Sequence, residues 1–151
     1  MDIPRAVGME IKALSNLFKR QLEAIGCCSM ENAPTGVQGM VIHFLADNQG
    51  KRDIFQRDIE LLFSMRRPTA TGILQVMEKN GLLYREPVEY DARLKKIILT
   101  EKATNLYRDT TVMFQQLEQQ LAQDISEDEL AQFFVTLEKI RKNAKDWSIT
   151  E

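Results

Sequence analysis

Two short β-prone segments lie in the middle of a chain whose other segments have helical periodicity, and this combination limits the possible folds more than any other feature. The β-prone segments are residues 82–85 and 94–99, and the polar stretch between them, residues 86–93, contains Pro87 and Asp91. This arrangement predicts an antiparallel hairpin with a long, charged tip. The expected fold class is therefore mainly α with one small β-hairpin.

Two amphipathic helices are expected near the start of the chain. Apolar residues recur every three or four positions over residues 5–25, and Gly26 is expected to end this first helix. After a loop, Thr35 and Gln38 have the spacing of a capping box, in which each side chain bonds an amide that the helix leaves unpaired. This predicts a second helix that extends to about Asp47.

A third and a fourth helix are expected between the second helix and the hairpin. Asp53 is the predicted cap of the short third helix, and Ser64 is the predicted cap of the fourth. Pro68 falls in the first turn of the fourth helix, where a missing N–H group costs little. Asn80 and Gly81 are expected to end that helix. Its inward stripe is predicted to be Ala70, Ile73, Leu74 and Met77.

Two further helices are expected after the hairpin. Thr100 is the predicted cap of a long helix that extends to about Gln123 with near-heptad apolar spacing, and Ser126 with Glu129 forms a capping box for the last helix. Apolar stripes of this length more often pack on a partner chain than on a small domain, so a partner chain is expected for these helices. The chain is therefore divided into an N-terminal helix and loop (1–34), a middle domain of three helices and the hairpin (35–100) and a pair of C-terminal helices (101–151).

The net charge of −2 is unevenly distributed along the chain. The middle third, residues 51–100, has 10 basic and 7 acidic side chains and a net charge of +3, whereas residues 1–50 have −1 and residues 101–151 have −4. An anionic partner is therefore expected to meet the middle third.

Several classes of protein are excluded by the composition. No apolar run approaches the ~18 residues that a membrane span requires, and the first residues lack the pattern of a secretory signal. Cys27 and Cys28 are the only cysteines, so a disulfide framework is not expected and a reducing cytoplasm is the predicted location. The chain has a single histidine and no phosphate-binding glycine loop, HExxH or GxSxG motif. We predict no enzymatic activity, no metal and no cofactor.

The fourth helix carries a polar outward face next to its apolar stripe. Two helices joined by a tight turn can present the second one to a DNA major groove, and a neighbouring hairpin can reach phosphates or the minor groove. Arginine matches guanine or phosphate, hydroxyl groups bond phosphates or bases, and a glutamine amide pairs with adenine. From this helix and the hairpin, the predicted contacts to double-stranded DNA are Ser64, Arg66, Arg67, Thr69, Thr71, Gln75, Arg85, Arg93, Lys95 and Lys96.

The hairpin region resembles the wing signature of the MarR family of bacterial winged helix-turn-helix regulators. Residues 79–85, which read KNGLLYR, match the family's KxGLhxR pattern, and residues 91–100, which begin DAR and end ILT, match DxRxxxxxLT. The resemblance implies a homodimer that binds a pseudopalindromic operator. In that case residues 35–100 form a winged helix-turn-helix DNA-binding domain, flanked by an N-terminal dimerisation helix and loop (1–34) and by C-terminal dimerisation helices (101–151). It also implies a transcriptional regulator, most often a repressor, that a small-molecule effector releases from DNA; many members of the family respond to phenolic ligands, oxidants or metals.

The resemblance also suggests roles for single residues. Arg93 has two compatible roles, entry into the minor groove or pairing with Asp91 to fix the shape of the wing tip. The resemblance implies the groove role for Arg93 and the structural role for Asp91. An effector pocket next to the second helix would be lined by Phe18, Met40 and His43, although His43 is also readily explained as a packed histidine with one hydrogen bond. The wing differs from the family pattern because residues 86–90 read EPVEY, which makes its tip less basic than usual.

Two alternatives remain open at this level. A winged-helix module that dimerises and binds a partner protein instead of DNA is consistent with the acidic wing tip. A thiol-based redox sensor acting through Cys27 and Cys28 is the other alternative, but the nearest preceding basic residue is Arg20. Without a cation or a helix N-terminus to lower a thiol pKa, unreactive cysteines are favoured.

Overall fold

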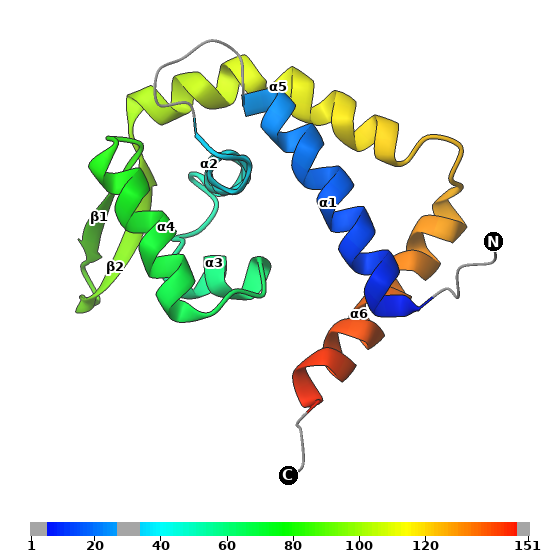
Figure 1. Ribbon diagram of the computed structural model, residues 1–151. Helices are drawn as coiled ribbons and strands as arrows, with labels where there is room; N and C mark the ends of the chain where they lie inside the picture. Colours follow the sequence, from blue (N-terminus) through cyan, green and yellow to red (C-terminus); the bar gives the residue numbers. More distant parts are fainter. Residues whose placement is uncertain (1–5, 27–33, 148–151) are drawn as a thin grey trace. The chain divides into compact units, whose positions relative to one another are not determined.

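The computed structural model describes residues 6–26 and 34–147, and these form helices with one antiparallel hairpin (Figure 1). The elements, in chain order, are α1 (Val7–Gly26), α2 (Gly36–Asn48), α3 (Gln56–Leu62), α4 (Arg67–Lys79), β1 (Leu83–Val88), β2 (Asp91–Leu99), α5 (Glu101–Leu121) and α6 (Glu127–Asp146). The predicted fold class, mainly α with a β-hairpin, is confirmed.

The chain divides into two compact units, residues 1–114 and 115–151. The first unit contains α1 to α4, the hairpin and the first part of α5. Its core joins α2, α3, α4 and the hairpin, because each contributes fully buried apolar side chains. The largest of these are Val41, Ile42, Ile59, Leu74, Met77, Leu82 and Leu83.

The inward stripe of α4 is confirmed. Ala70, Leu74 and Met77 are fully buried, and Ile73 is partly buried against the same core. Burial of one face fixes the rotation of the helix about its axis. The opposite, polar face of α4 is consequently turned to solvent.

Most of the predicted helix ends are also confirmed. Their capping contacts join residues only three or four positions apart, which can be predicted from the sequence. Thr35 forms its capping box with Gln38, and Ser126 forms one with Glu129. The Thr100 hydroxyl accepts a hydrogen bond from the amide of Ala103 at the start of α5, with a donor–acceptor distance of 3.3 Å.

Two predicted caps are wrong. The N-cap of α3 is Phe55, whose amide donates to the carboxylate of Asp58 at 2.8 Å, while Asp53 instead pairs with the ammonium of Lys96. The N-cap of α4 is Arg66 rather than Ser64. Ser64 has a φ of 49° and belongs to the turn that closes α3, where Met65 donates to the carbonyl of Glu60, so it lies too early to cap α4.

The predicted long tip of the hairpin is also wrong. The strands pair from Leu83 opposite Leu99 as far as Val88 opposite Asp91, so that only residues 89 and 90 form the turn. The register shifts between Pro87 and Val88, and residues 92–94 bulge out of β2. Proline is tolerated because β1 is an edge strand, and Val88 extends the strand because its side chain is buried.

The second unit consists of the end of α5 together with α6. None of the described residues of α6 is buried, and Phe133, Phe134 and Val135 are about half exposed. None of the helices in the described part of the chain has the length and apolar character needed to span a membrane.

Candidate nucleic-acid interface

The exposed face of α4 carries most of the side chains predicted to contact DNA. Arg66 and Arg67 lie at the helix start, and Thr69 and Gln75 follow on the solvent side; all four are exposed. Pro68 stands within the first turn, where its missing N–H group removes no helical bond. Ser64 is exposed in the turn before the helix. The structure therefore brings both arginines, Thr69 and Gln75 to the solvent-exposed side of a single helix.

Thr71 and Arg85 differ from these residues because they are half-buried and already hydrogen-bonded. Both bind Gln56, the first residue of α3. The Gln56 amide nitrogen donates to the Thr71 hydroxyl at 2.8 Å, and the Gln56 amide oxygen accepts from Arg85 Nη1 at 3.3 Å. Sequence reasoning missed Gln56, and no local pattern marks it, because its partners lie 15 and 29 positions away.

The end of the wing presents Arg93 to solvent. Its side chain is 91% exposed, and it donates through Nε and Nη2 to the two oxygens of Asp91 at 3.2 Å each. The backbone amide of Arg93 also donates to Asp91, and these hydrogen bonds lower the pKa of the Asp91 carboxyl. Asp91 thus orients both the backbone and the guanidinium of Arg93 in the bulged part of the hairpin.

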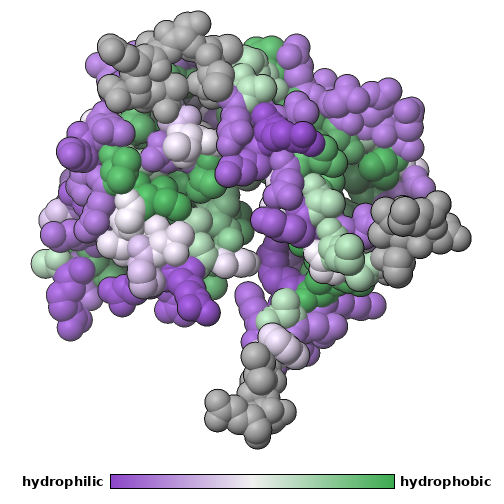
Figure 2. Space-filling view, in the orientation of Figure 1, coloured by the Kyte–Doolittle hydropathy of each residue, from purple (hydrophilic) through white to green (hydrophobic). Residues whose placement is uncertain are grey.

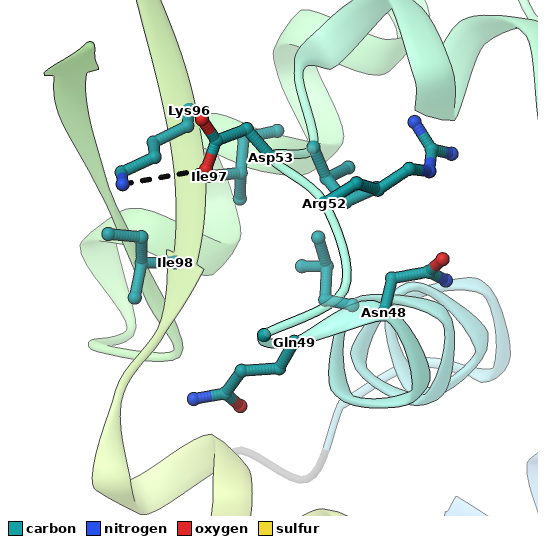
Figure 3. A pocket seen from close by; sticks show the side chains of 10 residues that line it. Asn48, Gln49, Arg52, Asp53, Lys96, Ile97 and Ile98 are labelled. Atoms are coloured by element: carbon teal, nitrogen blue, oxygen red, sulfur yellow. Dashed lines mark ion pairs between the residues drawn. The ribbon is translucent and has the colours of Figure 1, made fainter. Parts of the chain in front are cut away.

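Lys95 and Lys96 point to different environments, as expected for successive strand residues. Lys95 is exposed, whereas the ammonium of Lys96 lies 3.5 Å from the carboxylate of Asp53 (Figure 3). This ion pair borders a cavity of about 300 Å³ between the end of α2, the connection to α3 and β2. Gln49, Ile97 and Ile98 also line the cavity.

His43, the histidine predicted next to an effector pocket, is half-buried between α2 and α5. Its Nε2 lies 3.0 Å from the hydroxyl of Thr110, and its ring lies 3.9 Å from the Phe114 ring and 4.8 Å from the Tyr107 ring. Burial lowers the pKa of His43, although the nearby carboxylate of Asp47 acts in the opposite direction. The neutral imidazole is therefore the favoured form near neutral pH.

The other two residues predicted for that pocket, Phe18 on α1 and Met40 on α2, are each partly buried. None of the three lines the cavity shown in Figure 3. Cys27 and Cys28, the candidates for redox sensing, lie outside the described residues. Among the residues that the structure describes, no group of three or more potential metal ligands occurs.

The fold and this interface define the class of the protein. α3 and α4 are consecutive helices joined by a short turn, α4 exposes a basic and polar face, and an antiparallel hairpin follows directly. This is the arrangement of a winged helix-turn-helix domain.

Comparison with known proteins identifies the family. A sequence model described as the MarR family matches residues 34–94. The crystal structure of the transcription regulator MarR from Oenococcus oeni is 30% identical, with a TM-score of 0.77, over 94% of this chain and 100% of that one. MepR from S. aureus in its DNA-binding conformation is 25% identical, with a TM-score of 0.77, over 93% of this chain and 99% of that one. A MepR mutant bound to an oligodeoxyribonucleotide is also 25% identical, with the same coverage and a TM-score of 0.55.

The chain belongs to the MarR family of winged-helix transcription regulators.

Proposed function

We propose that this protein is a homodimeric, sequence-specific DNA-binding repressor that a small-molecule effector releases from a pseudopalindromic operator. The observation that carries the proposal is the exposed face of α4, with Arg66, Arg67, Thr69 and Gln75, in the same compact unit as the exposed Arg93 of the wing. The similar protein MepR has been solved with an oligodeoxyribonucleotide, which supports the same kind of partner for this chain.

We assign different tasks to the overall positive charge of the middle third and to the exposed face of α4. Phosphate neutralisation by the middle third of the chain, with its net charge of +3, supplies affinity that does not depend on sequence. The guanidinium groups and the Gln75 amide of α4 supply discrimination, because they match the edges of guanine and adenine in the major groove. We assign Arg93 to a minor groove, and its exposed side chain and its pairing with Asp91 support this role.

The proposed homodimer is supported by the apolar side chains that the single chain leaves exposed. On α1 these include Ile11, Leu14 and Leu17, and on α6 they include Phe133 and Phe134. Hydrophobic side chains are visible among the hydrophilic ones on the face drawn in Figure 2. Two-fold symmetry predicts half-sites about 10 base pairs apart, or a multiple of that spacing.

The proposed effector response involves Phe18, Met40 and His43. All three are partly buried within the first unit, and His43 already combines a hydrogen bond with two aromatic neighbours. A phenolic or other aromatic ligand suits such surroundings. If substitution of His43 and Met40 left every effector response unchanged, this part of the proposal would be wrong.

The test begins with selection of bound sequences from a random DNA pool, which should enrich a palindrome. Arg67→Ala should then weaken binding to the selected operator by about 1 to 3 kcal/mol if Arg67 reads a guanine. Arg141→Ala removes the same charge from α6, where no DNA contact is proposed. It is the matched control once its dimeric state is verified, and it should then have little effect. Equal losses on operator and random DNA would reassign Arg67 to a phosphate.

A protein-interaction module remains the second candidate, because the wing exposes the acidic Glu86 and Glu89 together with Tyr90, which is 71% exposed. Carboxylates on the wing oppose close approach to phosphates. A salt titration on duplex DNA separates the two functions, since affinity for DNA must fall steeply as salt rises. A verified dimer that binds no duplex at low salt would favour the module.

A further inference from the structure

The polar cluster around Gln56 joins the elements that the proposed function uses. Gln56 starts α3, and its amide nitrogen donates to Thr71 on α4 at 2.8 Å and to Glu60 on α3 at 3.0 Å. Its amide oxygen accepts from Arg85 on β1 at 3.3 Å. One side chain therefore connects the first helix of the helix-turn-helix (α3), the helix that carries the proposed base contacts (α4, here called the reading helix) and the first strand of the wing (β1).

Arg85 adds a second connection between the wing and α4. Its Nε lies 3.8 Å from a carboxylate oxygen of Glu78, near the end of α4, and its side chain is 25% exposed. This distance is within ion-pair range but beyond hydrogen-bond range, and Nε is buried without a hydrogen bond to any described residue. The guanidinium is thus held between Gln56 and Glu78 and is largely withdrawn from solvent.

We propose that Gln56 and Arg85 are positioning residues that hold the reading helix and the wing at the mutual orientation required for operator binding. This inference rests on the proposed DNA-binding function. It changes the role of Arg85 from a direct contact with DNA to a bridge between α4 and β1. The planar guanidinium suits this role because one of its nitrogen atoms donates a hydrogen bond to Gln56 while another lies within ion-pair distance of Glu78, an arrangement that an ammonium group cannot reproduce with the same geometry.

The two possible roles of Arg85 predict different responses to the same substitution. A phosphate contact needs mainly a positive charge, so Arg85→Lys would retain most of the affinity and the full salt dependence. A bridge between Gln56 and Glu78 needs the guanidinium fork, so Arg85→Lys would lose affinity although the charge remains. Gln56→Met removes the central amide at nearly constant side-chain length and leaves Arg85 in place.

The experiment measures binding of each variant to the selected operator by fluorescence anisotropy over a salt series. We expect Gln56→Met and Arg85→Lys each to weaken binding by about tenfold, the scale of one lost charge-assisted hydrogen bond. The slope of affinity against salt should remain that of the wild type. The double variant should lose little more than either single variant, because both remove the same bridge. Gln49→Met, at an exposed position of the same unit, is the matched control and should bind as the wild type does.

Urea unfolding of each variant accompanies the binding measurements. If Gln56→Met does not fold, Gln56→Asn is used in its place, since it keeps the amide but shortens its reach, and it should show the same loss. Wild-type affinity of Arg85→Lys, combined with a salt slope reduced by about one in Arg85→Gln, would make Arg85 a phosphate contact and overturn the inference. Wild-type binding by a folded Gln56 variant would overturn it as well. Absence of any duplex binding by the wild type would instead refute the proposed function and the inference together.

Discussion

Gly81 and Gly72 should respond in opposite directions to replacement by alanine, although neither site offers a steric obstacle. A Cβ atom added at either position would meet no heavy atom within 4 Å, so crowding plays no part in the comparison. The difference lies in the backbone. Gly81 has a φ of 69°, whereas Gly72 lies inside α4 with no such constraint.

The loss of stability expected for Gly81→Ala follows from the place of Gly81 between α4 and the wing. It follows the C-cap residue Asn80, and the next residue, Leu82, donates its amide to the carbonyl of Met77 at 2.9 Å. This bond closes the end of the helix and requires a left-handed residue at position 81. Alanine in that conformation costs about 1–2 kcal/mol, partly offset by the lower entropy of the unfolded chain, so Gly81→Ala should destabilise the protein by about 1 kcal/mol.

Gly72→Ala should stabilise the protein by about 1 kcal/mol, which is the helix-propensity difference between glycine and alanine. Urea unfolding checks both values, at one fixed protein concentration because a dimer's stability depends on concentration. The two variants should differ by about 2 kcal/mol, with midpoints on opposite sides of the wild type. Midpoints that move in the same direction would refute the argument from backbone conformation.

Further predictions concern the core, pH and the wing. Leu74→Ala removes a fully buried side chain from α4 and should reduce the free energy of unfolding by about 2–5 kcal/mol in urea titrations; a loss below 1 kcal/mol would contradict its place in the core. Burial lowers the pKa of His43 below its ordinary value of 6.5. The contribution of the neutral histidine to the free energy of unfolding is therefore complete above pH 6.5, and it is lost as pH falls through the lowered pKa of the folded state. The urea midpoint should therefore fall more between about pH 7.5 and about pH 5.5 in the wild type than in His43→Phe, and equal falls would contradict this assignment. Glu89→Lys at the exposed wing turn should strengthen duplex binding and steepen its salt dependence; unchanged binding would mean that the turn does not approach phosphates.

The features that were predicted correctly depend on neighbours close in sequence. The capping boxes of Thr35 and Ser126 and the buried stripe of α4 involve residues three or four positions apart, so helical geometry alone brings them together. The wing motif is also local, because Asp91 bonds Arg93 two positions later. In these cases the physical interaction is complete within one element.

The wrong predictions involve competition between local and distant partners. Asp53 has the residue type of a helix cap, but its carboxylate lies beside Lys96 on β2, and Asp58 takes over the local role. Pro87 suggested the end of a strand, but it continues β1 because that strand has a free edge and Val88 finds a buried position. Sequence spacing cannot decide such cases, since several partners are possible until the chain is compact.

The sequence by itself determined the helical order, the hairpin and the polar face of α4, because periodicity and local capping control which side of each helix is buried. Only the tertiary structure decided which polar groups of the candidate interface are exposed to solvent. Arg67 and Arg93 extend into solvent, whereas Thr71 and Arg85 are held by Gln56 across 15 and 29 positions of sequence. The physical reason is that these hydrogen bonds form only after burial of the apolar core brings α3, α4 and β1 together.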